Sequence, residues 1–550
     1  MITSLYGPDP PFILQEVTLY YFHRLSLPNT YIANYGQTLN DPYRGRHEAK
    51  VGLLSKRSAA YIGAFNFGLR LLIAPISFLF TVLVARYLSG MPEGTLVFGS
   101  WQYIFILITT YFTLPADILS FIISRYAAEE RAVGGIILLN LLMGALSSVL
   151  FFALSPIFVS QTKYVQGTIF FYISPILIIL TYLLKVTSSV AVGRTPTVYG
   201  ISTTLFQIGR LAVALVAMYI FNLSVTGVIL AYAAGYLIQT FINMRYVKAD
   251  LKMDMTVALT ALRKSVVFIV SKLQGLAEAT IVIVAVAFTG SAIINSYYES
   301  AIIVSNVIGW TASLPTGLIV QLKDEPKARV IESATKIFVV SSMLLMALVI
   351  AEARPLLHIM RPDYVGALAA TYVISISNLL RNFATIFYYA IGMRDETLAV
   401  QGGNSLRGPM GSIVRNNVAF SVIGVLLSVT LGYIFRESPY PIEVTLLSIG
   451  PMFNSVYMLH NSISKSRELY SFSFPWRETM VSVIVALVAG LPFSFVYVTR
   501  LSQMALEGLV VSGIYIGLCY ALSPYVRWLA TRGLTLLMSI TSRTQPPEGK

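Results

Sequence analysis

The chain has 550 residues, of which 56% are hydrophobic and only 12% are charged. Soluble domains contain about 25% charged residues, so this composition excludes a soluble multidomain protein, a disordered chain and a disulfide scaffold. The 39 Lys and Arg outnumber the 25 Asp and Glu, which gives a formal net charge of +14. In an apolar chain this excess indicates basic cytoplasmic loops, and no nucleic-acid partner is expected.

The first 59 residues are polar and rich in Pro, Asn and Tyr. They lack the basic, apolar and small-residue order of a signal peptide, so the first membrane helix is expected to remain as the anchor. We expect residues 1–59 to form a cytoplasmic N-terminal extension, with a lid or a partner-binding segment as the alternative.

Fourteen apolar runs follow, each approaching the roughly 20 residues that a membrane-spanning helix needs. The sequence therefore predicts an all-α polytopic membrane protein with about 14 transmembrane helices. The runs are 60–88, 97–123, 134–159, 168–190, 199–221, 225–242, 265–288, 295–320, 334–351, 366–391, 418–435, 444–459, 480–498 and 505–522.

The distribution of Lys and Arg predicts the orientation. With a cytoplasmic N-terminus, the cytoplasmic segments hold about 28 of these residues and the outer loops about 6, as counted from the sequence. An error in the helix count early in the chain would move every later loop to the other side and remove this bias. We therefore expect a protein of the plasma membrane with both termini in the cytoplasm.

The most basic internal connector divides the chain. We predict an N-lobe at 60–246, a basic cytoplasmic linker at 247–264 and a C-lobe at 265–464, each lobe with six helices. Two extra helices at 465–522 and a cytoplasmic tail at 523–550 complete the chain.

Four cationic side chains lie deep within the apolar runs, where an ionised group costs about 2.5–3.5 kcal/mol even on insertion scales. Lys185 and Glu299 are set aside, because each is near enough to a helix end to reach the interface. The four deep cations are Arg70, Arg210, Lys272 and Arg381.

The deep anions are Asp117 and Glu278. One interpretation pairs Arg70 with Asp117 and Lys272 with Glu278, which leaves two arginines to backbone carbonyls. The other places the cations around a hydrated cavity that binds an anion, for which the planar guanidinium of Arg is well suited. The two carboxylates would then hold the cations or carry a coupling proton or sodium ion.

Motifs for chemistry are missing from the sequence. There is no GxxxxGK[ST] phosphate loop, no HExxH, no GxSxG and no TVGYG-like filter. The four His are scattered and the only cysteine is Cys519. We expect neither a catalytic site nor a metal or other cofactor, and infer transport by conformational change.

Residues 78–130 resemble a known family. Ala85-Arg86-Tyr87-Leu88, Glu93-Gly94, Phe98-Gly99, Asp117 and Arg125-Tyr126-Ala127-x-Glu129 resemble the first two helices of the polysaccharide-transport and oligosaccharide-lipid flippases. These belong to the multidrug/oligosaccharidyl-lipid/polysaccharide exporter superfamily, together with the multidrug extruders and the lipid II flippases. The chain departs from the family at its long leader, at Met91-Pro92 and at Leu114-Pro115.

The resemblance implies two six-helix lobes around a central cavity that opens alternately to each side. It further implies a cationic lumen for a polyprenyl-(pyro)phosphate-linked glycan, and Arg70 and Asp117 match charged positions of such flippases in type and approximate position. The sequence thus favours a flippase for a lipid-linked oligosaccharide or polysaccharide precursor, with membrane lipids as further partners. The alternatives are a cation-coupled drug or metabolite antiporter of the same superfamily and, from a different class, a membrane glycosyltransferase, acyltransferase or polymerase.

Overall fold

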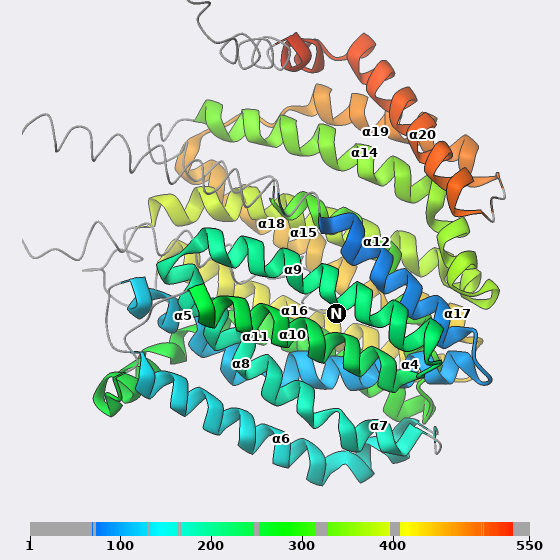
Figure 1. Ribbon diagram of the computed structural model, residues 1–550. Coiled ribbons are helices and arrows are strands. Elements are labelled where there is room, and N and C mark those ends of the chain that lie inside the picture. Colours follow the sequence, from blue (N-terminus) through cyan, green and yellow to red (C-terminus); the bar gives the residue numbers. More distant parts are fainter. Residues whose placement is uncertain are drawn as a thin grey trace, which may run out of the picture. The chain divides into compact units, whose positions relative to one another are not determined.

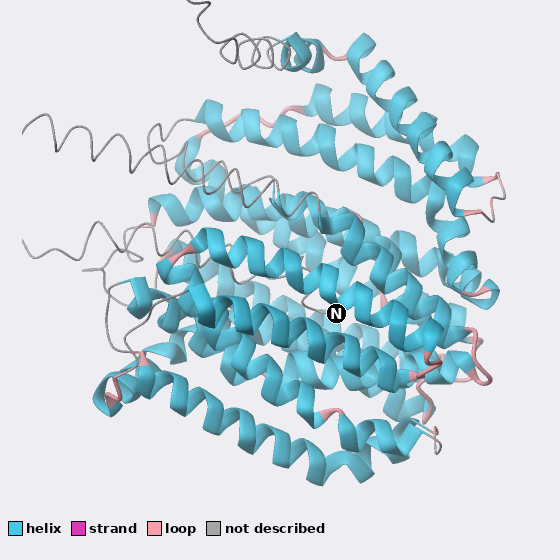
Figure 2. Ribbon diagram, in the orientation of Figure 1, coloured by secondary structure: helices cyan, strands magenta, loops and turns pink. Residues whose placement is uncertain are grey.

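The computed structural model describes residues 73–128, 133–162, 167–246, 252–313, 328–395, 408–496 and 500–531, with the single residues 69, 164 and 498. Within these ranges the chain is helical and contains no β-strand (Figure 2). Twelve of the described helices are long and apolar enough to cross a membrane. The chain is therefore a multi-pass membrane protein, and the predicted all-α fold class is confirmed.

The helices of the first half follow a shorter apolar helix at Ile73–Ser89 (Figure 1). They are α4 (Gly94–Ile106), the π-helix η2 (Leu107–Phe112), α5 (Leu114–Ala128), α6 (Gly134–Thr162), α7 (Thr168–Ile173), α8 (Pro175–Arg194), α9 (Pro196–Leu215), the π-helix η4 (Val216–Ile220), α10 (Val225–Tyr246), α11 (Met255–Thr289) and α12 (Ile293–Ser305).

The second half begins with a 3-10 turn and ends with two long helices. Its elements are η5 (Ile308–Ser313), α14 (Ala328–Met360), η6 (Pro362–Ala367), α15 (Leu368–Arg394), α16 (Pro409–Ile434), α17 (Tyr440–Leu447), α18 (Ile449–Tyr470), α19 (Trp476–Ser494) and α20 (Leu501–Leu522).

All fourteen predicted runs coincide with described helices. Twelve of the runs correspond to the twelve candidate spans. In the first run, the structure describes residue 69 and the helix from residue 73 onward. The eighth run corresponds to α12 and η5. The N-terminal extension 1–59 and the end of the tail after residue 531 lie outside the described residues.

The chain divides into two compact units. The first unit comprises Met1–Ile303 and Asp395–Asn454, and the second comprises Val304–Arg394 and Ser455–Lys550. Each unit consists of two separate stretches of the sequence, whereas the predicted lobes at 60–246 and 265–464 are each one continuous stretch. The lobe boundaries stay a prediction.

Helix α11 begins inside the stretch expected as a linker. Asp254 caps it, because its carboxylate accepts hydrogen bonds from the backbone N–H groups of Thr256 and Val257 at 2.9 and 3.2 Å. The hydroxyl of Thr256 also donates to Asp254 at 2.6 Å. This hydroxyl, with the two backbone groups, holds the pKa of the Asp254 carboxyl below its ordinary value.

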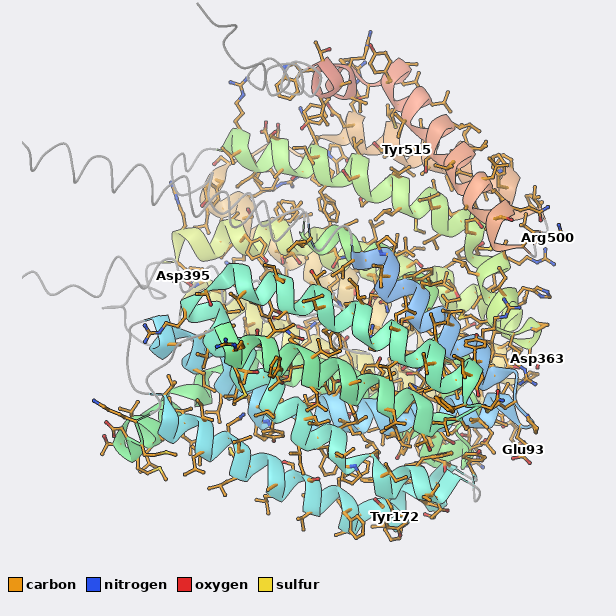
Figure 3. The ribbon with its side chains drawn as sticks, in the orientation of Figure 1. Glu93, Tyr172, Asp363, Asp395, Arg500 and Tyr515 are labelled. Carbon is orange, nitrogen blue, oxygen red and sulfur yellow. The ribbon has the colours of Figure 1, made fainter. Side chains whose placement is uncertain are left out.

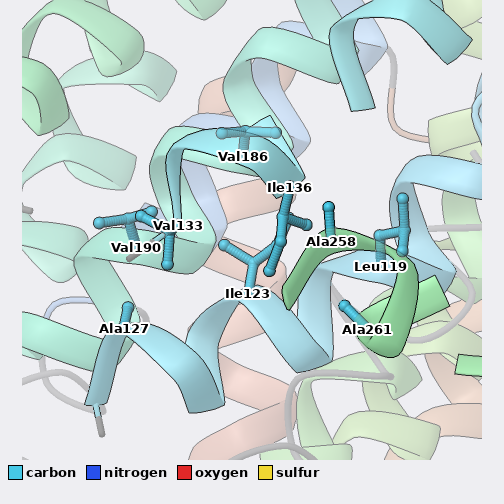
Figure 4. Close-up of a cluster of buried hydrophobic side chains, with 9 residues drawn as sticks. All are labelled: Leu119, Ile123, Ala127, Val133, Ile136, Val186, Val190, Ala258 and Ala261. Atoms are coloured by element: carbon cyan, nitrogen blue, oxygen red, sulfur yellow. The ribbon is translucent and has the colours of Figure 1, made fainter. Parts of the chain in front are cut away.

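The first turns of α11 are fixed by a buried apolar cluster that also contains residues of α5, α6 and α8 (Figure 4). Small side chains on α11 let these helices approach closely, and the larger aliphatic side chains of the other three fill the space between them. The cluster therefore fixes the positions of α5, α8 and α11. Its members are Leu119, Ile123, Ala127, Val133, Ile136, Val186, Val190, Ala258 and Ala261.

A second apolar cluster joins α14, α19 and α20 in the second unit. These three helices pack against one another, so α19 and α20 have a buried face of their own on α14. The buried members of the cluster are Ala347, Ala351, Val485, Ala486, Ala489, Val511, Tyr515 and Cys519.

Candidate functional site

The structure distributes the predicted site residues over both units. Asp117, Arg210, Lys272 and Glu278 lie in the first unit and Arg381 lies in the second. Arg70 lies outside the described residues, and so does its predicted pairing with Asp117.

A break in the second predicted membrane helix positions Asp117. The π-helix η2 ends where the N–H of Thr113 donates to the carbonyl of Ile108, five residues earlier, at 3.1 Å. Pro115 then lies in the first turn of α5, where its missing N–H is tolerated. Asp117 is also in this first turn, where the helix dipole favours a negative charge.

Two tyrosines attach the break to its neighbours. The hydroxyl of Tyr182 on α8 donates to the carbonyl of Phe112 at 3.0 Å. The hydroxyl of Tyr111 lies 3.0 Å from Thr280 Oγ1 on α11. The start of α5 is thereby held between α8 and α11.

Asp117 pairs with Lys185, which the apolar run places near a helix end. Lys185 Nζ on α8 lies 2.9 Å from Asp117 Oδ1, and the two side chains are only 16% and 13% exposed. Lys272 on α11 is a second cation within electrostatic reach of the Asp117 carboxylate. Helix α8 continues to Arg194 rather than ending near residue 190, so Lys185 lies deeper in its helix than the apolar run indicates.

Arg210 is enclosed by aromatic rings. Its guanidinium carbon lies 3.9 Å from the ring centroid of Phe80, 4.8 Å from that of Tyr232 and 5.0 Å from that of Phe206. Nη2 donates to Gln207 Oε1 at 2.5 Å, and the residue is 6% exposed. No ion pair to Arg210 is present among the residues described around it, so ring quadrupoles, the Gln207 amide and the Ser77 hydroxyl, which accepts from Nη2 at 3.3 Å, stabilise its charge.

Tyr236 connects this aromatic cage to the Asp117 pair. Its ring stacks on Phe206 with the centroids 5.6 Å apart and an interplanar angle of 5°. It lies within electrostatic reach of both Arg210 and Lys185. Sequence reasoning missed this residue, although Tyr232 and Tyr236 share one face of α10 by their spacing of four.

Glu278 and Arg381 have other surroundings. Asn454 Nδ2 donates to Glu278 Oε1 at 2.9 Å. In the second unit, Arg381 is buried and its Nη2 lies 3.4 Å from Ser455 Oγ. The structure therefore brings together Asp117, Lys185 and Lys272 and links them through Tyr236 to Arg210.

This group is suited to holding an anion. Its three cations and one carboxylate have a formal charge of +2, and they come from α5, α8, α9 and α11 of the same unit. Among the described residues there is no group of three or more His, Cys, Asp or Glu that could hold a metal ion.

Comparisons with known proteins identify the fold. No protein-family model and no curated protein matches the chain. Among solved structures, the lipid II flippase MurJ in an inward closed conformation matches with a TM-score of 0.60 and 11% sequence identity, over 82% of this chain and 98% of that chain.

Two further structures show the same arrangement. An inward-facing multidrug resistance MATE family transporter matches with a TM-score of 0.54 and 12% identity, over 72% of this chain and 95% of that chain. A MOP superfamily transporter from Pyrococcus furiosus, described as having a binding pocket of reverse polarity, matches with a TM-score of 0.50 and 13% identity, over 74% and 96%. The chain therefore has the fold of the MOP superfamily transporters, which confirms the fold that residues 78–130 imply by resemblance.

Proposed function

We propose that the protein is a flippase that moves a lipid-linked oligosaccharide or polysaccharide precursor across the plasma membrane by alternating access, with both termini in the cytoplasm. The observation that carries the proposal is the group formed by Asp117 and its neighbouring cations Lys185 and Lys272, with Arg210 linked to it through Tyr236. An anion in the membrane needs such a surrounding, because burying a charge without a partner is strongly unfavourable.

The polyprenyl-(pyro)phosphate group would be bound by Arg210 and Lys272, with Arg70 and Arg381 as the further cations predicted for the path. Asp117 would hold Lys185 in place while the phosphate binds, and Asp117 or Glu278 would carry a coupling proton or sodium ion. The sugar would cross within the protein while the lipid tail stays among membrane lipids.

The aromatic cage gives Arg210 a particular part in this cycle. No carboxylate pairs with its guanidinium among the described neighbours. An arriving phosphate therefore does not have to displace an internal anion. At 6% exposure, the guanidinium meets a phosphate only after rings of the cage move. Binding is thereby linked to a change in packing of α9 and α10.

A cation-coupled drug or metabolite antiporter of the same superfamily is the second candidate. The match to a multidrug resistance MATE family transporter favours it. The positive charge of the group around Asp117 favours the flippase, because a site for organic cations needs acidic or aromatic side chains without nearby cations. Drug-resistance assays on expressing cells separate the two: increased resistance to cationic drugs supports the antiporter.

Replacing Arg210 by Met should separate stability from transport. Met fills the cage without a buried charge, so the thermal stability of the purified protein should be unchanged or higher. Transport of a fluorescent polyprenyl-pyrophosphate glycan into proteoliposomes should fall about tenfold or more, since a hydrogen bond to a charged group contributes about 1.5–3 kcal/mol.

Arg361→Met is the matched control, because Arg361 forms a surface pair with Asp363 and lies outside the proposed path. It should leave transport unchanged. Full transport by Arg210→Met at normal protein level would contradict the anion site.

A further inference from the structure

The bundle of α14, α19 and α20 in the second unit contains two buried carboxyl groups. Glu352 lies on α14 and Glu507 on α20, and each is 7% exposed. Helix α20 can be located in Figure 3 by Arg500, which precedes its first residue, and by Tyr515, further along. Neither glutamate belongs to the group around Asp117.

The two glutamates lie at similar depth. Glu352 is eight residues before the end of α14 at Met360, and Glu507 is six residues after the start of α20 at Leu501. At a rise of 1.5 Å per residue these distances are about 12 and 9 Å. Because α14 and α20 pack against each other, the two side chains lie at a similar height in the bundle, in the half that the Lys and Arg distribution predicts to be outer.

Glu352 points toward the turn of α20 that contains Glu507. A Cβ built on Gly508 would lie 3.8 Å from Glu352 Oε1, and Glu352 is within electrostatic reach of Glu507. All four carboxyl oxygens are buried and have no hydrogen-bond partner among the described residues. The apolar cluster of α14, α19 and α20 includes Ala351, which precedes Glu352, and Val511, one turn after Glu507.

The other titratable groups around α14 are engaged elsewhere. On α15, the Tyr372 hydroxyl donates to the Ile350 carbonyl at 3.3 Å. On α20, the Tyr515 hydroxyl donates to the Val340 carbonyl at 2.8 Å. The side chain of Arg354, on α14 itself, is exposed.

The remaining charged groups lie at the ends of these helices. Arg361 pairs with Asp363 at 2.7 Å beyond the end of α14. Glu478, in the first turn of α19, lies 3.5 Å from Lys336 near the opposite end of α14, and Arg500 is exposed. The charged group that acts on the Glu352 carboxyl is Glu507, and no described cation is within electrostatic reach of either carboxyl.

From this geometry we propose that Glu352 and Glu507 form a proton-binding site in which one proton is shared between the two carboxyl groups. Two carboxylates that are buried side by side without donors repel each other and lose hydration, and a proton on one of them removes both penalties and supplies a donor to the other. Among the described residues, no third His, Cys, Asp or Glu joins the pair in a group that could hold a metal ion.

Infrared difference spectroscopy on the full-length protein in lipid nanodiscs tests the site. The C=O stretch of protonated carboxyl groups is recorded while the pH is changed. The wild type should show a protonated carboxyl that the Glu352→Gln/Glu507→Gln double variant lacks. Gln has the shape of protonated Glu, so the double variant should fold, and a monodisperse elution profile verifies this.

Glu468→Gln is the matched control, because Glu468 is exposed and pairs with Lys465; its protonated-carboxyl signal should equal that of the wild type. An unchanged signal in the double variant overturns the proposal. Loss of the wild-type signal on adding sodium at constant pH also overturns it, since a metal ion would then be the ligand. The site does not rest on the proposed transport, because this measurement needs no substrate.

Discussion

Replacing Asp117 by Ala should lower the free energy of unfolding by about 3–5 kcal/mol, the range measured when one partner of a buried ion pair is removed. The pair with Lys185 is short and both side chains are largely buried. Its removal leaves Lys185 and Lys272 as neighbouring cations without their shared carboxylate. Denaturant titration of the purified protein in detergent, followed by tryptophan fluorescence, measures the change.

Lys185→Ala should have a smaller effect than Asp117→Ala, because Lys272 still neutralises the carboxylate. The exposed pair of Lys465 and Glu468, which are 38% and 61% exposed, gives the matched control. Lys465→Ala should change stability by less than about 1 kcal/mol. Equal effects of Asp117→Ala and Lys465→Ala would contradict the buried arrangement.

Replacing Gly99 by Ala should destabilise the protein by about 1–3 kcal/mol through overpacking. Gly99 on α4 lies against the residue that precedes α12: a Cβ at this position would be 2.7 Å from the carbonyl carbon of Ala292 and closer still to its oxygen. The backbone cannot move aside easily, because Asn295 Nδ2 donates to the Gly99 carbonyl at 2.9 Å. The thermal midpoint of the purified variant checks this.

Gly513→Ala is the corresponding control on α20. A Cβ at Gly513 meets nothing within 4 Å, so the exchange should raise stability by about 0.4–1 kcal/mol through the better helix propensity of Ala. If both Ala variants were equally stable, the close approach at Gly99 would be refuted.

The fold was predictable from the sequence because membrane helices are long apolar runs, and each of the fourteen runs contains a described helix. At residues 98–117, the resemblance to the flippase family also pointed to residues that the structure shows to be important for packing and charge pairing. Phe98-Gly99 was recognised as a family pattern, and the structure gives a packing reason for its glycine. Asp117 was identified as a deep charge, and it is indeed paired in the first unit.

The partners of these charges were not predictable from the same pattern. Depth along a run places Arg210 near the middle of its helix but does not show which face points to the rings of Phe80 and Tyr232. Hydropathy places Lys185 near a helix end, because the apolar run ends before α8 does. The pairing of side chains depends on helix rotation and on helices distant in sequence, such as the contact of Tyr111 with Thr280. Neither is encoded in hydropathy.

The π-helix η2 explains how one membrane pass serves two different environments. A π-turn shifts the helix by one residue relative to regular α-helix, which turns everything beyond it by about 100°. Before the turn, Trp101 and Phe105 contact Tyr232 of α10, and beyond it Asp117 meets Lys185 of α8. The spacing between Phe105 and Asp117 is thus a structural requirement in itself: an uninterrupted helix with the same side chains would aim the carboxylate away from its lysine.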